Sequence, residues 1–339
     1  MAILITGGAG YIGSHVAHAL VDAGEQVVVV DDLSTGVAHP IPASTPLFVG
    51  NCGDAGLLGE VVSRHDVTTI MHFAGSIYAS ESIENPQRYH QNNVVNTRSL
   101  IESAIRHEIS QFVFASTAAI YGQMSQVPVM EDAPTHPLSP YGQSKLACEK
   151  MLHDAAASTD LKFVVLRHFN VAGADPQIRT GQLTPAATHV IRRAIQTAIG
   201  LRPHLEVYGT DYATPDGTCI RDYIHVADAV RAHVDALRYL RAGGTSVALN
   251  CGSGRGASVC EVIRSVKRVS NVDFRVVLGP RRAGDPASVI ASPLRARAVL
   301  GWQPQVADLD EVVRHALAWE MKLRTTRDSP AAPIETSKD

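Results

Sequence analysis

Short, continuous apolar runs alternate with segments of helical periodicity through the first half of the chain. The apolar runs predict β-strands over residues 2–6, 26–32, 47–49, 68–73, 111–115 and 161–167. Between them, apolar positions at helical spacing predict helices over 14–21, 55–64, 86–107 and from 140 onward. Continuously apolar strands that alternate with helices are typical of a parallel sheet covered on both faces. The pattern therefore predicts an α/β fold, a Rossmann-type doubly wound parallel sheet.

The pattern changes after Ala174, which suggests a second, smaller α/β substrate domain at the C-terminal end. The elements expected there are a polar loop over 175–185, a helix over 187–201, a strand over 205–208, a loop over 209–222, a helix over 226–241 and a strand over 247–251. We expect the last strand to return to the main sheet. The predicted domains are therefore 1–172, joined by a returning segment near 223–252, and 173–325, and the polar, Pro-containing residues 326–339 are predicted to form a flexible tail.

The first strand runs into a turn with glycines at Gly7, Gly10 and Gly13, followed by a helix. Glycines without Cβ atoms allow a sharp turn and a close approach of the backbone to a pyrophosphate, and the helix N-terminus offers free N–H groups to phosphates. Asp31 ends the second strand, 18 residues after Gly13, close to where an adenosine ribose needs an acceptor. A carboxylate there repels a 2′-phosphate, so NAD is favoured over NADP. Without this context, the same pattern would also fit a glycine-rich turn that binds nothing.

Composition places the chain among ordinary soluble enzymes. Hydrophobic residues make up 45% and charged residues 19% of its 339 residues, and the net charge of −3 with scattered Lys and Arg predicts neither a nucleic-acid partner nor a membrane surface. The N-terminus enters a strand at once, unlike a signal peptide. Five cysteines without CxxC spacing (Cys52, Cys148, Cys219, Cys251 and Cys260) suggest reduced thiols in the cytoplasm. His15 and His18 share a helix face without a third ligand and are interpreted as surface or packing residues, so no metal site is predicted.

Ser139 and Pro140 favour the start of a helix that places Tyr141 and Lys145 one turn apart on the same face. A nearby ammonium group and the positive nicotinamide of NAD⁺ would stabilise a phenolate and lower the pKa of Tyr141. Tyr141 could then act as a general base toward a hydroxyl, with Thr117 bonded to the reacting oxygen. A solvated i,i+4 pair on a helix surface is the plainer alternative for these two residues.

The residues that follow each predicted strand are the first candidates for a site, because ligands bind beyond the carboxyl ends of parallel strands. They include Asn51 and Phe73–Gly75, and an amide of the Asn92–Asn93 pair could face a ligand as well. Together with Thr6-Gly-Gly-Ala-Gly-Tyr-Ile-Gly13, Ser116-Thr117 and Tyr141 to Lys145, these motifs resemble the extended short-chain dehydrogenase/reductases. Within that family the chain is most similar, from Ala2 to about Trp319, to the epimerases that act on C4 of UDP-glucose. The most specific stretches are Arg167-His-Phe-Asn170, Thr188-His189, residues 216–226 and residues 280–285.

The resemblance implies a resident NAD and a UDP-sugar substrate. It implies the following cofactor-binding residues: Gly7, Gly10, Tyr11, Ile12, Gly13, Asp31, Asp32, Asn51, Phe73, Ala74, Gly75, Asn93, Ser116, Tyr141 and Lys145. It implies the following substrate-binding residues: Thr117, Tyr141, Asn170, His189, Tyr208, Arg221, Tyr223, Arg282, Asp285 and Val289. Tyr141, Lys145 and Thr117 would be catalytic, with Thr117 in the position of the family's serine. The arginines suit diphosphate oxygens, although surface salt bridges would also explain them.

Three positions depart from the family pattern. Ile77 stands where the family often has a lysine near the cofactor, which would weaken the retention of NAD. Asn51 replaces an aspartate near the adenine, a mild change because its amide oxygen still accepts hydrogen bonds. Val289 replaces a bulky tyrosine found in some relatives at the hexose pocket, which would leave room for UDP-N-acetylhexosamines.

The implied reaction interconverts UDP-glucose and UDP-galactose. Oxidation at C4 by NAD, rotation of the 4-keto sugar and return of the hydride would give the epimer without net redox change. A dehydratase of this family would need an acid/base pair after Thr117, where Ala118 and Ala119 stand. Epimerisation of a UDP-pentose or UDP-hexuronate, a net dehydrogenase or reductase, and a non-catalytic NAD sensor remain open. The resemblance also implies a homodimer that rests on the helices over 86–107 and 140–157.

Overall fold

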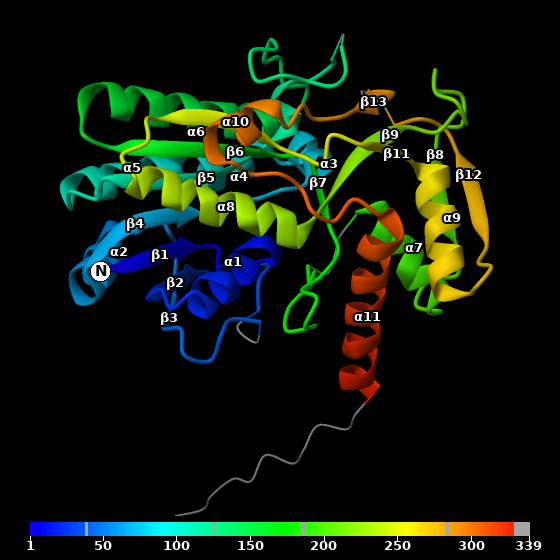
Figure 1. The fold of residues 1–339 in the computed structure, drawn as a ribbon, viewed down its shortest axis with the longest axis horizontal. Helices are drawn as coiled ribbons and strands as arrows, with labels where there is room; N and C mark the ends of the chain where they lie inside the picture. The colour runs from blue at the N-terminus through cyan, green and yellow to red at the C-terminus, as the bar shows by residue number, and fades with distance from the viewer. Residues whose placement is uncertain (38–39, 125, 185–187, 283–284, 329–339) are drawn as a thin grey trace, which may run out of the picture.

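The computed structural model describes residues 1–37, 40–124, 126–184, 188–282 and 285–328, and these are built around a seven-stranded, fully parallel sheet (Figure 1). Its order is β10-β6-β5-β4-β1-β2-β3. The strands are β1 (Ala2–Thr6), β2 (Val27–Asp31), β3 (Leu47–Val49), β4 (Val67–His72), β5 (Gln111–Thr117), β6 (Lys162–His168) and β10 (Val247–Cys251). The order reverses at β1, so a crevice for a ligand is expected beyond the carboxyl ends of β1 and its neighbour β4.

Helices cover both faces of this sheet, as the continuously apolar strands predict. They are α1 (Tyr11–Asp22), α2 (Ala55–His65), α3 (Ala79–Glu84), α4 (Pro86–Tyr89), the π-helical η1 (His90–Val95), α5 (Asn96–Arg106), α6 (Pro140–Ser158) and α8 (Val226–Arg241). Alternate residues of each strand pack on opposite faces: Ile3 and Ile5 of β1 contribute to the core with α1 and α8, and Leu4 to the core with α2, α5 and α6. The Rossmann-type α/β fold is confirmed.

Most of the remaining elements form a second group beside the carboxyl ends of the main strands (Figure 1). A four-stranded sheet contains β7 (Asn170–Ala172), β9 (Ile220–His225), β11 (Gly256–Ser258) and β13 (Ser288–Val289), and β8 (Leu205–Tyr208) pairs with β12 (Val276–Gly279). The helices of this group are α7 (Val190–Ala198), α9 (Val259–Ser270) and α11 (Leu309–Asp328). The short η2 (Ala118–Ile120) packs on α6, and α10 (Leu294–Leu300) packs on α8 and β10 of the main layer. A separate core joins α7, α9, α11, β8 and β12. The boundaries at 172 and 325 stay a prediction.

Several predicted boundaries differ from the structure. Strand β9 begins at Ile220, within the expected loop over 209–222, because Ile220 pairs with Ser258 and Ser288 from distant parts of the chain. Helix α7 begins at Val190 and ends at Ala198, so it is shorter than the predicted helix over 187–201. Helix α11 extends to Asp328, three residues into the expected tail, and the rest of that tail, 329–339, lies outside the described residues.

Two further points concern the return of the last strand to the main sheet and the possibility of membrane-spanning helices. Strand β10 pairs in parallel with β6 and so returns to the main sheet, as predicted. Within the described ranges, the helices are either too short or too polar to cross a membrane.

Candidate active site

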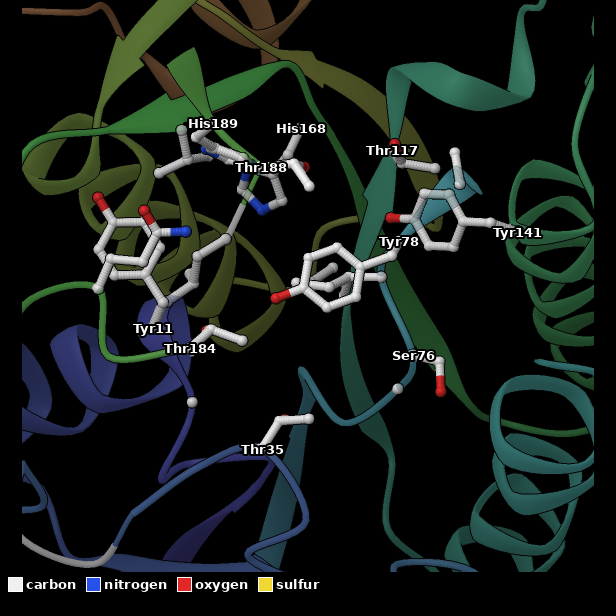
Figure 2. A pocket seen from close by; sticks show the side chains of 18 of the residues that line it. Tyr11, Thr35, Ser76, Tyr78, Thr117, Tyr141, His168, Thr184, Thr188 and His189 are labelled. Carbon is white, nitrogen blue, oxygen red and sulfur yellow. The ribbon is translucent and has the colours of Figure 1, made fainter. Parts of the chain in front are cut away.

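A cavity of about 510 Å³ lies beyond the carboxyl ends of the main strands, between the parallel sheet and the second group of elements (Figure 2). All of the site residues that the sequence predicts line this cavity, except Asn93 and Val289. These residues come from segments that are up to 278 positions apart, from Gly7 to Asp285. The structure therefore brings the two predicted halves of the site, one for a dinucleotide and one for a nucleotide-sugar, into one continuous space.

The glycine-rich turn between β1 and α1 forms one end of the cavity. Gly7 has a φ of +75°, and a Cβ atom there would lie 2.4 Å from the backbone nitrogen of Ala74. A Cβ on Gly13 would lie 2.2 Å from the carbonyl oxygen of Gly7. Both positions therefore require glycine, and the N-terminus of α1 opens onto the space beside them. This cradle fits the pyrophosphate of a dinucleotide.

The carboxylates at the end of β2 fit the ribose end of the same cofactor. Asp31 accepts hydrogen bonds of 2.9 Å from the backbone N–H groups of Ala9 and Leu33, which fixes the carboxylate beside the glycine turn. Burial raises the pKa of Asp31. Each of its oxygens keeps a second lone pair for a ribose hydroxyl. The Asp32 carboxylate accepts hydrogen bonds from the N–H and the hydroxyl of Ser34. The Asn51 side chain accepts a hydrogen bond of 2.7 Å from the N–H of Gly53.

Tyr141 and Lys145 lie in the first turns of α6, and both line the cavity. Pro140 is the first helical residue, and the Ser139 hydroxyl accepts a hydrogen bond from the N–H of Gly142, so the helix begins as predicted. Burial raises the pKa of Tyr141, and a hydrogen bond with Thr117 opposes that rise. Figure 2 shows the side chains of Tyr141 and Thr117 facing each other from α6 and the end of β5. Thr117 thus contributes to lowering this pKa, and the role expected of Lys145 and the nicotinamide of NAD⁺ stays a prediction.

Lys145 is almost completely buried, and its burial lowers the pKa of the ammonium group to about 8. Its Nζ atom lies 4.2 Å from the centre of the Phe114 ring, a cation–π contact. The lysine therefore stays largely protonated at neutral pH. It can hold a positive charge against a ligand in a place from which water is excluded.

A buried polar network beneath the cavity was not predicted from the sequence. The Ser116 hydroxyl donates to Glu149, and Glu149 forms an ion pair of 2.8 Å with Arg167. Arg167 also donates a hydrogen bond of 2.8 Å to the hydroxyl of Tyr121. Glu149 lies one turn after Lys145, so the network ties the helix of Tyr141 to the strand end that carries Thr117. The sequence held one signal for this network: Lys145 and Glu149 are spaced i,i+4, which places both side chains on the same face of the predicted helix.

The opposite end of the cavity is lined by charged and aromatic side chains from separate segments. Arg221 of β9 forms an ion pair with Asp285, and the Arg282 guanidinium lies 3.9 Å from the centre of the Tyr208 ring. The other lining residues predicted for the substrate are Asn170 in β7, Tyr223 in β9, and His189, which precedes α7. Burial lowers the pKa of His189 and raises that of Tyr223. A cationic end beside an aromatic ring suits a nucleotide diphosphate.

Two predicted residues lie outside the cavity lining. The Asn93 amide accepts a hydrogen bond of 2.7 Å from the N–H of Ser76 and donates to the backbone oxygen of Ser76 and the hydroxyl of Ser144, so it supports the turn after β4 from below. Val289 of β13 packs beside buried residues that include Ile120 and Ala291. The room that this small side chain would leave for an N-acetylated sugar stays a prediction.

The cavity has further lining residues that the sequence did not single out. The polar side chains among them include Ser34, Thr35, Ser76, Tyr78, Arg88, Gln182, Thr184, Arg193 and Glu206. Ser76 and Tyr78 directly follow the predicted Phe73–Gly75 turn, so a wider window at that strand end would have found them. Outside the cavity, His15 and His18 bond to the backbone oxygens of Tyr11 and Pro40, respectively, which agrees with a packing role.

Comparison with known proteins adds independent information. Residues 3–252 match the model of the NAD dependent epimerase/dehydratase family. The chain is 53% identical over 331 residues to the UDP-glucose 4-epimerase of Azospirillum brasilense, a match that covers 98% of this chain and 95% of that protein.

Solved structures give the same relation. The crystal structure of UDP-glucose 4-epimerase from Brucella ovis in complex with NAD is 41% identical, with a TM-score of 0.91, and covers 94% of this chain and 97% of that one. The UDP-Glc/GlcNAc 4-epimerase from Campylobacter jejuni is 42% identical, with a TM-score of 0.83, and covers 95% of this chain and 99% of that one.

Proposed function

We infer that this chain, which belongs to the NAD-dependent epimerase/dehydratase family, is an isomerase that interconverts UDP-glucose and UDP-galactose. One observation carries the inference: a single cavity joins a glycine-built dinucleotide cradle to an arginine-lined end, with Tyr141 and Thr117 at the junction. Relatives named UDP-glucose 4-epimerase cover nearly the whole chain, with 53% and 44% identity for two of them. The family membership makes NAD the cofactor.

The residues of the first half would hold that cofactor. The glycine turn would receive the pyrophosphate, Asp31 the adenosine ribose, and Lys145 the nicotinamide ribose. Asn93 would act indirectly, because it fixes the Ser76 turn without reaching the cavity. When bound, NAD⁺ supplies an acceptor for the hydride on C4 of the sugar and later returns that hydride.

Tyr141 would carry the proton transfer. Its phenolate takes the proton from the 4-hydroxyl of the sugar while Thr117 holds the same oxygen by a hydrogen bond. With NAD⁺ bound, the positive charge that Lys145 keeps in its buried position would add to the stabilisation of the phenolate. After the 4-keto sugar has turned its other face toward the nicotinamide, Tyr141 gives the proton back.

The arginine-lined end would hold the substrate during that rotation. Arg221 and Arg282 would bind the diphosphate, with Asn170 and His189 beside it, Tyr208 near the uracil, and Asp285 on the uridine ribose. Tyr223 lines the same end. Anchoring through the diphosphate leaves the hexose free to turn, which is the requirement of a 4-epimerase.

The direct test is epimerisation without added cofactor. We expect purified protein to convert UDP-galactose into UDP-glucose, and the reverse, as followed by NMR. A steady accumulation of NADH without the other epimer would replace the assignment by a dehydrogenase. If the protein converts only a UDP-pentose or a UDP-hexuronate, the assignment as a 4-epimerase stands and the assigned sugar changes.

N-acetylated sugars are a second candidate substrate class. The relative from Campylobacter jejuni is named a UDP-Glc/GlcNAc 4-epimerase, and it is 42% identical to this chain. Incubation with UDP-N-acetylglucosamine in the same NMR assay tests this proposal, which fails if the acetylated sugar stays unchanged.

We also propose a cytoplasmic homodimer. Cys52, Cys148, Cys219, Cys251 and Cys260 are all free thiols, as expected in a reducing compartment. The outer faces of the helices over 86–107 and 140–157 are the proposed contact. Light scattering coupled to gel filtration tests the dimer, and a monomer at micromolar concentration would exclude it.

A further inference from the structure

Tyr78 places a phenol in the middle of the cavity, although neither the glycine turn nor the Tyr141 motif accounts for it. Figure 2 shows its side chain reaching into the cavity, with the hydroxyl directed toward the side where Tyr11 and Thr184 lie. The neighbouring Ile77 has 49% of its surface exposed. Of these two consecutive residues, Tyr78 is therefore the one that offers a hydrogen-bonding group to the interior.

The backbone of Tyr78 is held firmly. Its N–H donates a hydrogen bond of 3.0 Å to the hydroxyl of Tyr89, which in turn donates to Glu81 at 2.9 Å. The Tyr89 ring meets that of Tyr141 edge to face, with 6.3 Å between ring centres. Tyr78 is thus tied, through one side chain, to the residue proposed to carry the proton transfer.

The hydroxyl of Tyr78, by contrast, is buried and has no hydrogen-bond partner among the described residues. Burial of an unsatisfied hydroxyl costs free energy, and such a group is retained where something else bonds to it. Burial and the nearby Glu81 raise the pKa of this phenol, while Arg192 opposes the rise, so the group stays protonated and can donate. The oxygens of a nucleotide ligand are the acceptors that would enter this space.

We propose that Tyr78 is a ligand-binding residue whose hydroxyl donates a hydrogen bond to a phosphate or sugar oxygen at the centre of the cavity. The acceptor belongs either to the cofactor or to the UDP-sugar, because the two meet there; the proposal thus rests on the proposed function. In either case Tyr78, with its fixed backbone, helps to set how the two ligands lie relative to Tyr141.

Tyr78→Phe removes only the hydroxyl, and Tyr212→Phe is the matched control. The hydroxyl of Tyr212 is also buried and without a partner among the described residues, but Tyr212 does not line the cavity. Three quantities would be measured for each variant: the NAD released from the denatured protein and its rebinding, the dissociation constant of UDP by calorimetry, and KM and kcat for UDP-glucose.

We expect Tyr78→Phe to weaken one of these binding steps by roughly three- to tenfold, the effect of one hydrogen bond, while Tyr212→Phe changes none. A loss of NAD identifies the cofactor as the acceptor. A raised KM identifies the substrate as the acceptor. If UDP also binds more weakly, the acceptor is an oxygen of the diphosphate; if UDP binding is unchanged, the acceptor is an oxygen of the hexose. Neither variant should lower Tm, because each removes an unpartnered group.

The proposal is overturned if Tyr78→Phe matches wild type in all three quantities. Failure of the proposed function would look different, because wild-type protein itself would then leave UDP-glucose unchanged. The NAD and UDP binding measurements would still decide the role of Tyr78 in that case.

Discussion

The two ends of the cavity differ in which part of the chain forms them, the backbone at one end and side chains at the other. At the cofactor end the shape comes from the backbone: Gly7 and Gly13 leave no room for a Cβ atom, and Asp31 is fixed by two backbone N–H groups. At the substrate end it comes from side chains: Arg221 is paired with Asp285, and Arg282 stacks over Tyr208.

This difference suits the two ligands. A backbone cradle is preorganised and needs no rearrangement, which favours a cofactor that stays bound through many turnovers. Charged side chains on separate segments can exchange one partner for another, and under the proposed function Arg221 would leave Asp285 for a phosphate of the substrate. The comparison predicts that substitutions at one end leave binding at the other end intact.

The largest effect is expected at the junction of the two ends. Tyr141→Phe should lower kcat by about 10²–10⁴-fold, because the general base is removed, while NAD content and UDP affinity stay at wild-type values. Epimerisation is followed by NMR and binding by calorimetry. Full activity of this variant would exclude Tyr141 as the base.

Gly13→Ala should affect the cofactor end alone. The new Cβ would lie 2.2 Å from the carbonyl oxygen of Gly7, and we expect the free energy of unfolding to fall by about 3 kcal/mol with loss of retained NAD. Gly59→Ala in α2 is the control, because its Cβ would meet its nearest neighbour at 3.5 Å. Urea unfolding and NAD content are the measurements, and equal stability of the two variants would contradict the close approach.

Lys145→Met should separate stability from activity. The pKa of Lys145 falls from 10.5 to about 8 on folding, so below pH 8 the lysine is protonated in both states and the cost of burying its charge is fully present. We expect the variant to lose turnover yet gain up to about 3 kcal/mol in free energy of unfolding at pH 7.

That gain should shrink as the pH rises from 8 to 10.5, because folded wild-type protein then releases the proton that the unfolded chain still holds. Urea unfolding of both proteins at pH 7 and pH 9.5 tests this sign. A gain that is larger at pH 9.5 would refute it.

Arg282→Ala should weaken UDP binding by about ten- to a hundredfold and leave NAD content unchanged, since a charge-assisted hydrogen bond to phosphate is lost. Arg281→Ala is the matched control, because Arg281 pairs with Asp211 and does not line the cavity. Calorimetry with UDP distinguishes the two. An equal loss of UDP affinity in both variants would mean that the overall positive charge of this end, and not the position of the Arg282 side chain, governs UDP binding.

Local signals explain what could be predicted from the sequence. Continuous apolar runs identified the strands of the parallel sheet, because both faces of each strand are buried. The turn from Gly7 to Gly13, Asp31 at a strand end, and the pair Tyr141 and Lys145 are all defined by neighbours within one or two elements. The family resemblance then supplied the residues of the substrate end, which no local pattern connects to the cofactor.

The sequence by itself thus determined the fold class, the dinucleotide turn and the helical pairing of Tyr141 with Lys145. Only the tertiary structure decided which side chains reach the cavity: Asn93 supports the turn at Ser76, Val289 packs beside Ile120 and Ala291, and Tyr78 points into the cavity. The physical reason is that strand ends, turns and helical spacing are set by neighbours in the chain. The direction of a side chain within an assembled site depends on contacts between segments that are far apart in sequence.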